Sequence, residues 1–377
     1  MSRNILMLVS AMNSGGAERV AANLVNAWSA RGDRVTLLVT FSGKGECFYQ
    51  LADNVRLVYL ADLAGHMGKG IRAYWARYFA LRKFLKQTRP DVVVAFLTNV
   101  NVATLLAAIG LSLKVIVAEH IYPPMLPVGG VLNTLRRLTY PVAFRVTMLT
   151  QEGLTWLTTL IPKASGVVIP NPVTYPLPLG TPALSPATII DSERSLLLAI
   201  GRMDMQKGFD YLLESFAAIA SQYSHWDLVI LGEGPEHNRL IQQVADLKMQ
   251  HRVLLPGRAG NMAEWYARAD LYVMSSRFEG FPNTLVEAMA HGCAAVSYDC
   301  DTGPRDIIRD GVDGLLITPV GDVPALTQAL DRLMGNDAER NQMAQRATEV
   351  RERYSMPRIL AQWDALFDSV EKGRPTR

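Results

Sequence analysis

The chain has 377 residues, of which 49% are hydrophobic and 19% charged, and its formal net charge is +3 at pH 7. This composition is typical of a folded globular protein and excludes an intrinsically disordered chain, and the length favours two domains. The three cysteines, Cys47, Cys293 and Cys300, form neither a disulfide framework nor a Cys/His metal-binding pattern, which fits a reducing cytoplasm.

The small net charge hides an asymmetry between the two halves. Lys and Arg outnumber Asp and Glu by 18 to 8 in residues 1–190, whereas residues 191–377 carry 20 of the former and 27 of the latter. A basic first half suggests phosphates or an anionic membrane as partners. Nucleic acid is not expected, because no nucleic-acid motif accompanies the charge.

Short apolar runs rich in β-branched residues alternate with helical patterns along the whole chain. Runs this apolar predict parallel sheets that are covered on both faces, so each half is expected to be a doubly wound α/β domain. The predicted strands are 4–10, 34–41, 55–60, 91–97, 114–120 and 145–149 in the first half, and 195–202, 226–234, 252–258, 271–276, 294–300 and 314–319 in the second.

No segment is interpreted as a membrane span or a signal peptide. The uncharged stretch 92–113 is long enough to span a membrane, but Thr98, Asn99, Asn101 and Thr104 interrupt it, and strand–helix–strand is the better interpretation. The apolar run at the N-terminus is too short for a signal peptide and enters a Gly-Gly turn.

The proline-rich stretch after residue 168 cannot continue either pattern and predicts the connection between the domains. The expected organisation is an N-terminal domain over 1–172, a linker over 173–190 and a C-terminal domain over 191–355. Residues 337–370 are predicted to form amphipathic helices, with no strand among them.

Two segments at predicted strand ends suit a bound anion. Gly15 and Gly16 form a tight turn into a helix, whose backbone N–H groups can face a phosphate. After the first strand of the second half, Arg202 and Lys207 flank a short loop and could clamp a diphosphate. The dinucleotide fingerprint GxGxxG is absent, which argues against a Rossmann oxidoreductase.

Two further strand ends carry candidate residues. Glu119 and His120 end a predicted strand, and His120 is a candidate active-site residue. Asp299 and Asp301 form a D-x-D pattern that could hold a divalent cation, but the pattern is weak and a strand-end loop before a helix is the preferred interpretation.

Two glutamates, Glu279 and Glu287, lie on either side of a loop-to-helix junction in the sequence SSRFEGFPNTLVEAMAHG, residues 275–292. The unpaired N–H groups of residues 281–284 at the helix start suit a phosphate. Carboxylates on both sides of that phosphate suit sugar hydroxyls. A glycosidase is unlikely, because its two carboxylates would lie on opposite faces of one sugar.

Over nearly its whole length the chain resembles the retaining glycosyltransferases of family 4, which have the GT-B fold of two facing Rossmann-like domains with a cleft between them. The motifs that carry the resemblance are SGGAERV, GRMDMQKGFDYLLESF, LGEGPE, LPGR, SSRFEGFPNTLVEAMAHG and TGPRDIIRDGVDGLLI. Their order and number make it specific. The family's E-x7-E motif matches Glu279 and Glu287, its cation pair matches Arg202 and Lys207, and its histidine matches His120.

The resemblance implies roles for these residues. Arg202 and Lys207 would bind the donor diphosphate without a metal or other cofactor, Glu287 the ribose and Glu279 the donor hexose, and Arg258 would line the base. Pro282 stands where many members have glycine and removes one N–H from the phosphate contact. The remaining donor contacts would come from Gly15, Gly16, Gly280, Phe281, Asn283 and Thr284. The last helix, 356–377, would pack on the first domain.

The implied reaction is transfer of a hexose or N-acetylhexosamine from a nucleotide sugar, with UDP as the first choice of nucleotide, to a glycan acceptor. Motifs with these residues are common in enzymes that build lipid-linked bacterial surface polysaccharides. The acceptor is therefore expected to be linked to polyprenyl diphosphate. The enzyme is therefore expected to be cytoplasmic and attached peripherally to the inner face of the cytoplasmic membrane. The alternative is a catalytically silent sugar-nucleotide-binding protein.

Residues 68–89 suggest how such an enzyme would meet the membrane. They combine seven Lys and Arg residues with five aromatic ones, and Tyr74, Tyr78, Leu81 and Leu85 recur at helical spacing. A basic amphipathic helix of this kind can lie in a lipid interface. The other interpretation is a helix whose apolar stripe packs on its own sheet.

Overall fold

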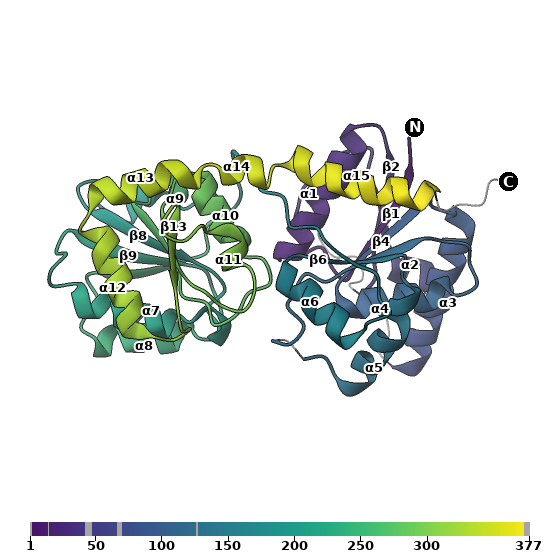
Figure 1. Cartoon of the computed structure of the whole chain (residues 1–377), viewed down its shortest axis with the longest axis horizontal. Coiled ribbons are helices and arrows are strands. Elements are labelled where there is room, and N and C mark those ends of the chain that lie inside the picture. Colours follow the sequence, from purple (N-terminus) through teal and green to yellow (C-terminus); the bar gives the residue numbers. More distant parts are fainter. Residues whose placement is uncertain (1, 14, 42–46, 66–69, 126, 373–377) are drawn as a thin grey trace. The chain divides into compact units, whose positions relative to one another are not determined.

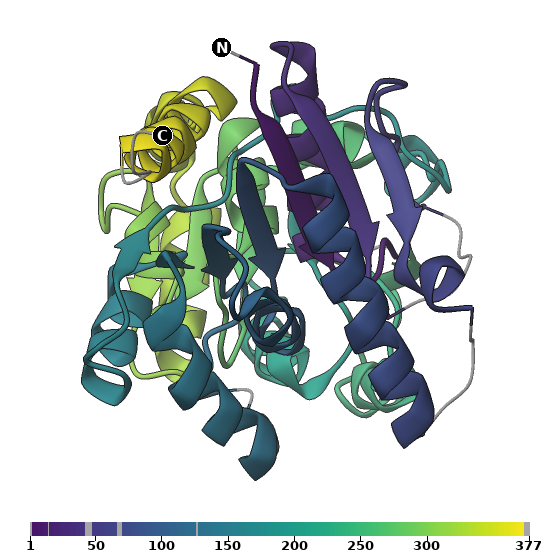
Figure 2. The same ribbon diagram turned by 90° about the vertical axis from the view of Figure 1, so that its right-hand side faces the viewer.

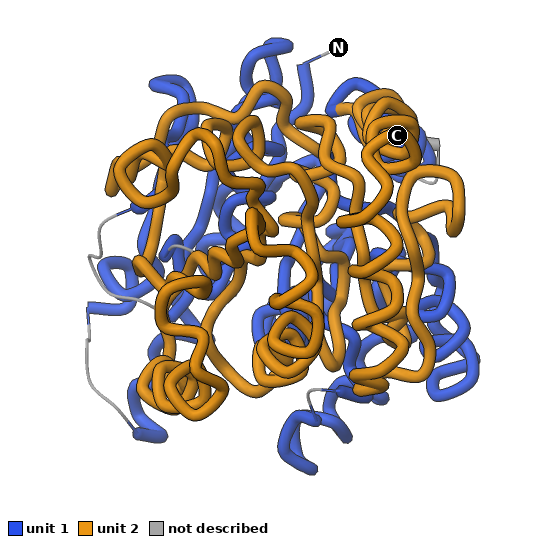
Figure 3. The backbone as a smooth tube through the Cα atoms, turned by 90° about the vertical axis from the view of Figure 1, so that its left-hand side faces the viewer, with its two compact units in different colours: residues 1–172, 356–377 blue, residues 173–355 orange. Residues whose placement is uncertain are grey.

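The computed structural model of the chain describes residues 2–13, 15–41, 47–65, 70–125 and 127–372. It divides into two compact units (Figure 3), each described here by itself. Unit 1 comprises residues 1–172 and 356–377, and unit 2 comprises residues 173–355.

Unit 1 is built on a parallel sheet in which the first strand lies in the interior. Its described strands follow the order β3-β2-β1-β4-β5-β6-β7. The register is regular, with Ile5 of β1 opposite Val35 of β2 on one side and Val92 of β4 on the other. The strands are β1 Asn4–Val9, β2 Arg34–Val39, β3 Arg56–Tyr59, β4 Val92–Phe96, β5 Val115–Ala118, β6 Arg145–Met148 and β7 Gly166–Val168.

Successive side chains of each strand enter two different cores, because strand side chains alternate between the faces of a sheet. In β1, Ile5 and Met7 belong to one core, and Leu6 and Leu8 to the other. Helices cover both faces (Figure 2). They are α1 Gly16–Ala30, α2 Leu60–Ala64, α3 Ile71–Thr88, α4 Thr98–Ala108, α5 Gly130–Thr139 and α6 Gln151–Leu160.

The C-terminal helix α15, Met356–Lys372, packs in unit 1 although it follows unit 2 in the chain (Figure 1). Trp363 and Phe367 lie against Trp28 of α1, with ring centroids 5.9 and 5.5 Å apart. An ion pair between Arg3 and Asp364, 3.0 Å, ties the helix to the start of β1. The last helix therefore completes one of the two cores of unit 1.

Unit 2 repeats the architecture with the strand order β10-β9-β8-β11-β12-β13, again parallel in its described strands. Its first strand, β8, lies between β9 and β11. The strands are β8 Ser195–Ile200, β9 Trp226–Leu231, β10 Val253–Gly257, β11 Leu271–Met274, β12 Ala295–Tyr298 and β13 Gly314–Ile317.

Helices cover this second sheet as well. One core combines apolar side chains of β8, β9 and β11 with those of α7 and α12. The helices of unit 2 are α7 Phe209–Ile219, α8 His237–Asp246, α9 Met262–Arg268, α10 Asn283–Ala290, α11 Pro304–Ile307, α12 Val323–Met334, α13 Asp337–Ala347 and α14 Val350–Arg353. The predicted class, two doubly wound α/β domains, is confirmed.

Two local expectations need revision. The strand β7 was not predicted from the sequence. The proline-rich segment 173–190 is grouped with unit 2 rather than forming a free connection, because Trp265 of α9 donates a hydrogen bond of 2.8 Å to Leu184 O and Asn261 accepts one of 2.9 Å from Leu184 N.

The predicted apolar stripe of α3 divides into two parts. Leu81 and Leu85 are buried in the core of unit 1, whereas Tyr74 is 66% exposed. An 18-residue helix is about 27 Å long and the five-residue strand β4 about 17 Å, so the helix extends beyond the sheet that it covers. The C-terminal part of the stripe therefore packs in the core of unit 1, whereas its first residue is exposed.

Among the described residues, no helix combines the length and the apolar character that crossing a bilayer requires.

Candidate active site

The loops that follow β8 and β11 carry most of the predicted site residues and lie beside each other, because these two strands are neighbours in the sheet. Besides the contact between Lys207 and Glu279, four hydrogen bonds join the described loops. The backbone N–H of Arg277 donates to Gln206 O (2.7 Å), the Gln206 amide to Phe278 O (2.9 Å), and Ser275 Oγ to Lys207 O (2.9 Å). The fourth runs from the Arg277 guanidinium to the carbonyl of Met205 (2.8 Å). The carboxyl edge of the sheet is thus held as one surface.

A glycine permits this close approach of the two loops. Gly208 precedes α7 with a φ of 58°, and a Cβ at this position would lie 2.2 Å from the carbonyl oxygen of Ser275. A side chain would therefore both strain the backbone and separate the loops. The glycine at 208 is therefore required by the close packing of the loop after β8 against the loop after β11.

The two predicted residues Lys207 and Glu279 form an ion pair at this surface. Lys207 Nζ lies 2.6 Å from Glu279 Oε1, and Ser276 Oγ donates to the same oxygen at 2.6 Å. Glu279 is only 7% exposed. The stem of Lys207 lies directly over Gly201, where a Cβ would meet its Cε at 2.9 Å. The ammonium group is therefore held at the edge of the site by its stem and by its partner.

The second glutamate, Glu287, is buried one turn inside α10, and Tyr266 of α9 donates a hydrogen bond to its Oε2 at 3.1 Å. Tyr272 donates to Thr284 Oγ1 at 2.9 Å. Burial raises the pKa of the Tyr272 hydroxyl well above its usual value, and the negative charges of Glu279 and Glu287 raise it further. Both carboxylates therefore act on one buried tyrosine.

The N-terminus of α10 begins at Asn283, so Pro282 is the residue before the first helical turn. Because Pro282 precedes the helix, its missing N–H removes no hydrogen bond from within α10. The unpaired backbone N–H groups at the start of the helix belong to the residues that follow Pro282. Thr302 Oγ1 donates to the carbonyl oxygen of Glu279, and Gly303 packs against Gly280 and Pro282. The TGPRDII motif thus supports the loop from behind.

The other two predicted cations of unit 2 are arranged differently. Arg202 is 74% exposed at its side chain and pairs with Asp204 at 2.7 Å, rather than joining Lys207 in a common clamp. Arg258 follows β10 on the same edge of the sheet. Asp299, one half of the D-x-D pattern, accepts a hydrogen bond of 2.8 Å from Arg305, and the described residues contain no cluster of three potential metal-ligating side chains.

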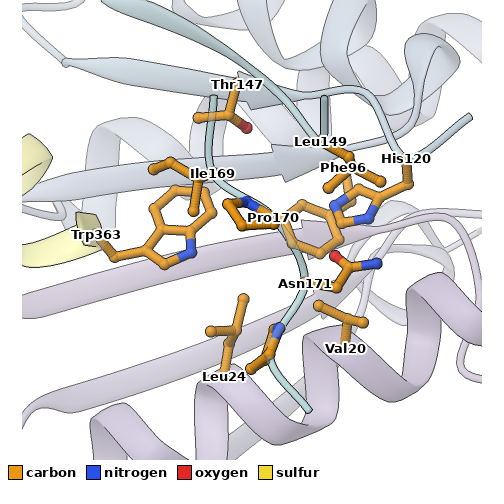
Figure 4. A pocket seen from close by; sticks show the side chains of 11 residues that line it. Val20, Leu24, Phe96, His120, Thr147, Leu149, Ile169, Pro170, Asn171 and Trp363 are labelled. Carbon is orange, nitrogen blue, oxygen red and sulfur yellow. The ribbon is translucent and has the colours of Figure 1, made fainter. Parts of the chain in front are cut away.

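In unit 1, His120 follows β5 and stacks on Phe96 with ring centroids 3.8 Å apart (Figure 4). Neither ring nitrogen has a hydrogen-bond partner among the described residues. Burial lowers the pKa of His120 to about 3, so the ring is neutral at pH 7. The cavity beside it in unit 1 is about 10 Å³, enough for one water molecule but not for a sugar.

The neighbouring Glu119 has a different environment. It is buried, accepts hydrogen bonds from Thr98 and Tyr140, and lies 4.0 Å from Arg136 of α5. Burial raises its pKa. The Glu119 carboxylate therefore anchors α4 and α5 to the end of β5, a structural role that the EH pair in the sequence does not reveal.

The predicted turn at the start of α1 is partly described. Gly15 precedes the helix in an extended conformation, and Tyr49 donates a hydrogen bond of 2.9 Å to its carbonyl oxygen. Gly16 is the first residue of α1. Gly15, Gly16 and His120 thus all lie at the carboxyl edge of the sheet of unit 1, as expected.

Arg277 is a positioning residue that the sequence reading did not single out. Its guanidinium bonds both oxygens of Asp210 (2.9 and 2.7 Å) and lies 4.1 Å from the centroid of the Tyr211 ring. The same group bonds Met205 O, so one side chain ties α7 to both loops of the site. The only signal in the sequence was an arginine two residues before Glu279.

Replacing Arg277 with lysine is expected to lower the unfolding free energy by about 1–2 kcal/mol and to weaken nucleoside diphosphate binding, because lysine cannot reproduce the fork of hydrogen bonds. Arg239→Lys is the matched control. Arg239 lies 3.9 Å from the same Asp210 but is 55% exposed, so its loss should change little. Thermal unfolding and calorimetry measure both effects, and equal effects of the two variants would contradict the positioning role.

Comparison with known proteins identifies the family. Residues 15–172 match the family model described as "Glycosyl transferase 4-like domain", and residues 181–350 match "Glycosyl transferases group 1". The chain belongs to the family 4-type glycosyltransferases that these two models together describe.

One curated relative matches almost end to end. It is an α-1,4-N-acetyl-D-galactosaminyltransferase of Campylobacter jejuni, named for an undecaprenol-diphosphate-linked substrate. It is 27% identical over 369 residues, which is 97% of this chain and 99% of the relative.

Two solved structures support the fold, which is GT-B. Sucrose-phosphate synthase from Thermosynechococcus elongatus superposes with a TM-score of 0.82 at 17% identity, covering 99% of this chain and all of the other. HepE from Anabaena, solved with UDP, superposes with a TM-score of 0.77 at 18% identity, covering 97% and 100%. At these identities the similarity concerns the fold alone.

Proposed function

We propose that this glycosyltransferase moves a hexose or N-acetylhexosamine from a nucleotide sugar to a polyprenyl-diphosphate-linked glycan with retention, forming an α-bond in surface polysaccharide synthesis. The observation that carries the proposal is the arrangement of Lys207, Glu279 and Glu287 around the start of α10. A cation, a helix N-terminus and two buried carboxylates suit a diphosphate between two sets of sugar hydroxyls.

Each charged candidate residue of unit 2 then has a role. Lys207 and Arg202 bind the diphosphate, assisted by backbone N–H groups at the start of α10. Glu287 accepts hydrogen bonds from the ribose hydroxyls, and Glu279 from the hydroxyls of the donor hexose. Arg258, after β10, lines the base.

Unit 1 has two candidate features of its own, the Gly15–Gly16 turn and His120. The turn offers backbone N–H groups to an anion at the start of α1. His120 is neutral at pH 7, and its buried ring nitrogens have no hydrogen-bond partner among the described residues, so the ring would add no charge next to a sugar. Because the cavity beside it is too small for a sugar, such a contact requires the residues that line the cavity to move apart. We assign it to the reacting sugar.

UDP is the proposed nucleotide, and no metal is required, because the two cations supply the positive charge that a metal would otherwise bring. The Anabaena protein of similar fold was solved with UDP, and the Campylobacter relative is named for an N-acetylgalactosaminyl transfer to an undecaprenol-diphosphate glycan. The first supports a UDP-sugar donor and the second a lipid-linked acceptor.

A screen of nucleotide sugars tests this function directly. UDP-Gal, UDP-GalNAc, UDP-Glc and UDP-GlcNAc are tested by thermal shift and by hydrolysis, and the donors that bind are then offered polyprenyl-diphosphate glycans in excess EDTA. Transfer in EDTA is expected. Binding without turnover would favour a catalytically silent sugar-nucleotide-binding protein, and recovery only on adding Mg²⁺ or Mn²⁺ would contradict metal independence.

We further propose that unit 1 attaches to the inner face of the cytoplasmic membrane through α3. Ile71, Tyr74, Trp75 and Phe79 are between 57 and 77% exposed. They recur at helical spacing on the first turns of α3, and Trp75 stacks on Phe79 with centroids 5.9 Å apart. Exposed aromatic side chains with nearby lysines suit an anionic lipid interface.

Vesicle co-sedimentation is expected to show binding that requires anionic lipid and falls with added salt. Lys83→Glu and Lys86→Glu, on exposed positions of α3, should each weaken binding about fivefold or more, since one cation near the surface is worth about 1 kcal/mol. Lys163→Glu, an exposed lysine after α6, is the charge-matched control. Equal effects of all three variants would argue against attachment through α3.

A further inference from the structure

The two proposed diphosphate cations are each paired with a carboxylate of the protein itself. Lys207 contacts Glu279 at 2.6 Å, and Arg202 contacts Asp204 at 2.7 Å. Their exposure differs greatly. The side chains of Lys207 and Glu279 are 17 and 7% exposed, whereas that of Arg202 is 74% exposed. Both members of the first pair are shielded from water, whereas in the second pair only Asp204, 15% exposed, is shielded and Arg202 is solvated, so the first pair should resist separation more strongly.

The geometry restricts what Lys207 can do. Its stem lies over Gly201, its carbonyl oxygen accepts from Ser275, and its ammonium faces a carboxylate that Ser276 also binds. Only the end of the side chain can change partner. An arriving diphosphate therefore meets an ammonium group that is already engaged with Glu279.

We propose that Glu279 competes with the diphosphate for Lys207, and that this competition lets the site distinguish a nucleotide sugar from a free nucleoside diphosphate. The inference rests on the proposed function and deepens it. When a diphosphate takes over the ammonium, the Glu279 carboxylate loses its charged partner in a buried position, which is costly. A nucleotide sugar offers hydroxyl donors to that carboxylate, whereas the nucleoside diphosphate offers none.

The consequence for turnover concerns product release. After transfer, the remaining nucleoside diphosphate no longer satisfies Glu279, so re-formation of the Lys207–Glu279 pair favours its departure. In the opposite role, the carboxylate would orient the ammonium toward the phosphate, since an ammonium group has three donors. The two roles predict opposite signs for the effect of removing the carboxylate charge.

The test is calorimetry on the full chain, with whichever of UDP, GDP and ADP binds the wild-type protein most tightly. Glu279→Gln is expected to raise the affinity for this free nucleoside diphosphate about tenfold, because a neutral amide does not compete for Lys207. Asp204→Asn is the matched control. It removes one negative charge beside the solvated Arg202 and should raise the affinity by about twofold at most.

The remaining variants separate a local exchange from other causes. In the background Lys207→Ala, the gain from Glu279→Gln should vanish, because the contested cation is absent. Glu279→Ala, which removes the same negative charge, should also raise the affinity and replaces Glu279→Gln if that variant does not fold. Equal gains from Glu279→Gln and Asp204→Asn would show a general charge effect and overturn the inference.

A lower or unchanged affinity in Glu279→Gln would also overturn it, in favour of an orienting carboxylate. Different results would contradict the proposed function itself. If Lys207→Ala alone leaves the affinity unchanged, or if the wild-type protein binds no nucleoside diphosphate, the donor site itself is wrong.

Discussion

Replacing Lys207 with alanine is expected to weaken nucleoside diphosphate binding by about 1.5–3 kcal/mol, or about 10- to 150-fold, while leaving the protein folded. The reason is the loss of a shielded cation at the carboxyl edge of unit 2, whose stem is held over Gly201. A water molecule can replace its hydrogen bond but not its charge. Isothermal calorimetry measures the change, and thermal unfolding verifies the fold.

Lys248→Ala provides the control, because Lys248 is the only other lysine in residues 173–355. It lies just before β10, at the amino edge of the same sheet, and is exposed. The same charge is lost from the opposite edge, so the affinity should be unaffected. Similar losses in both variants would show that Lys207 acts only through the net charge of unit 2.

Replacing Glu287 with glutamine is expected to weaken the nucleoside diphosphate and the nucleotide sugar alike, each about tenfold. Its carboxylate is buried on α10 and proposed to accept from the ribose, which both ligands contain. Glutamine is chosen because its amide oxygen can still accept the hydrogen bond from Tyr266, so that no buried hydroxyl is left unpaired. Calorimetry with both ligands gives the two affinities.

Glu279→Ala serves as the comparison, since this carboxylate is assigned to the hexose. It should not weaken the nucleoside diphosphate, but it should damage binding and turnover of the sugar donor. If both glutamate variants lose nucleoside diphosphate affinity equally, the assignment of one to the ribose and the other to the hexose is wrong.

Much of the fold could be predicted because its strands are buried on both faces. Continuous apolar runs such as residues 91–97 have no other stable placement than the interior of a parallel sheet. The strand β7 escaped prediction for the opposite reason. It has three residues, all of them only half-buried at the edge of the sheet, so its sequence carries little pattern.

The site was predictable as a list of strand-end residues but not as a geometry. That Lys207 and Glu279 meet follows from the position of β8 beside β11, which is the usual order of a doubly wound sheet. The partners that fix the carboxylates, Tyr266 and Ser276, and the clamp Arg277 depend on side-chain packing across elements. No local sequence pattern encodes such contacts.

The stripe of α3 shows the same limit. Helical spacing correctly grouped Tyr74 with Leu81 and Leu85 on one face, but spacing cannot tell where the sheet beneath the helix ends. The exposure of Tyr74 follows from the difference in length between α3 and β4, a property of the assembled unit.

The anomeric configuration of the transferred sugar tests the central claim most directly. With a donor from the nucleotide-sugar screen, in which the sugar is α-linked to the diphosphate, the purified product is analysed by proton NMR at the anomeric position. An α-linked sugar on the acceptor glycan is expected, made by the wild-type chain and lost in Lys207→Ala. A β-linked product, or transfer that persists undiminished without Lys207, would contradict it.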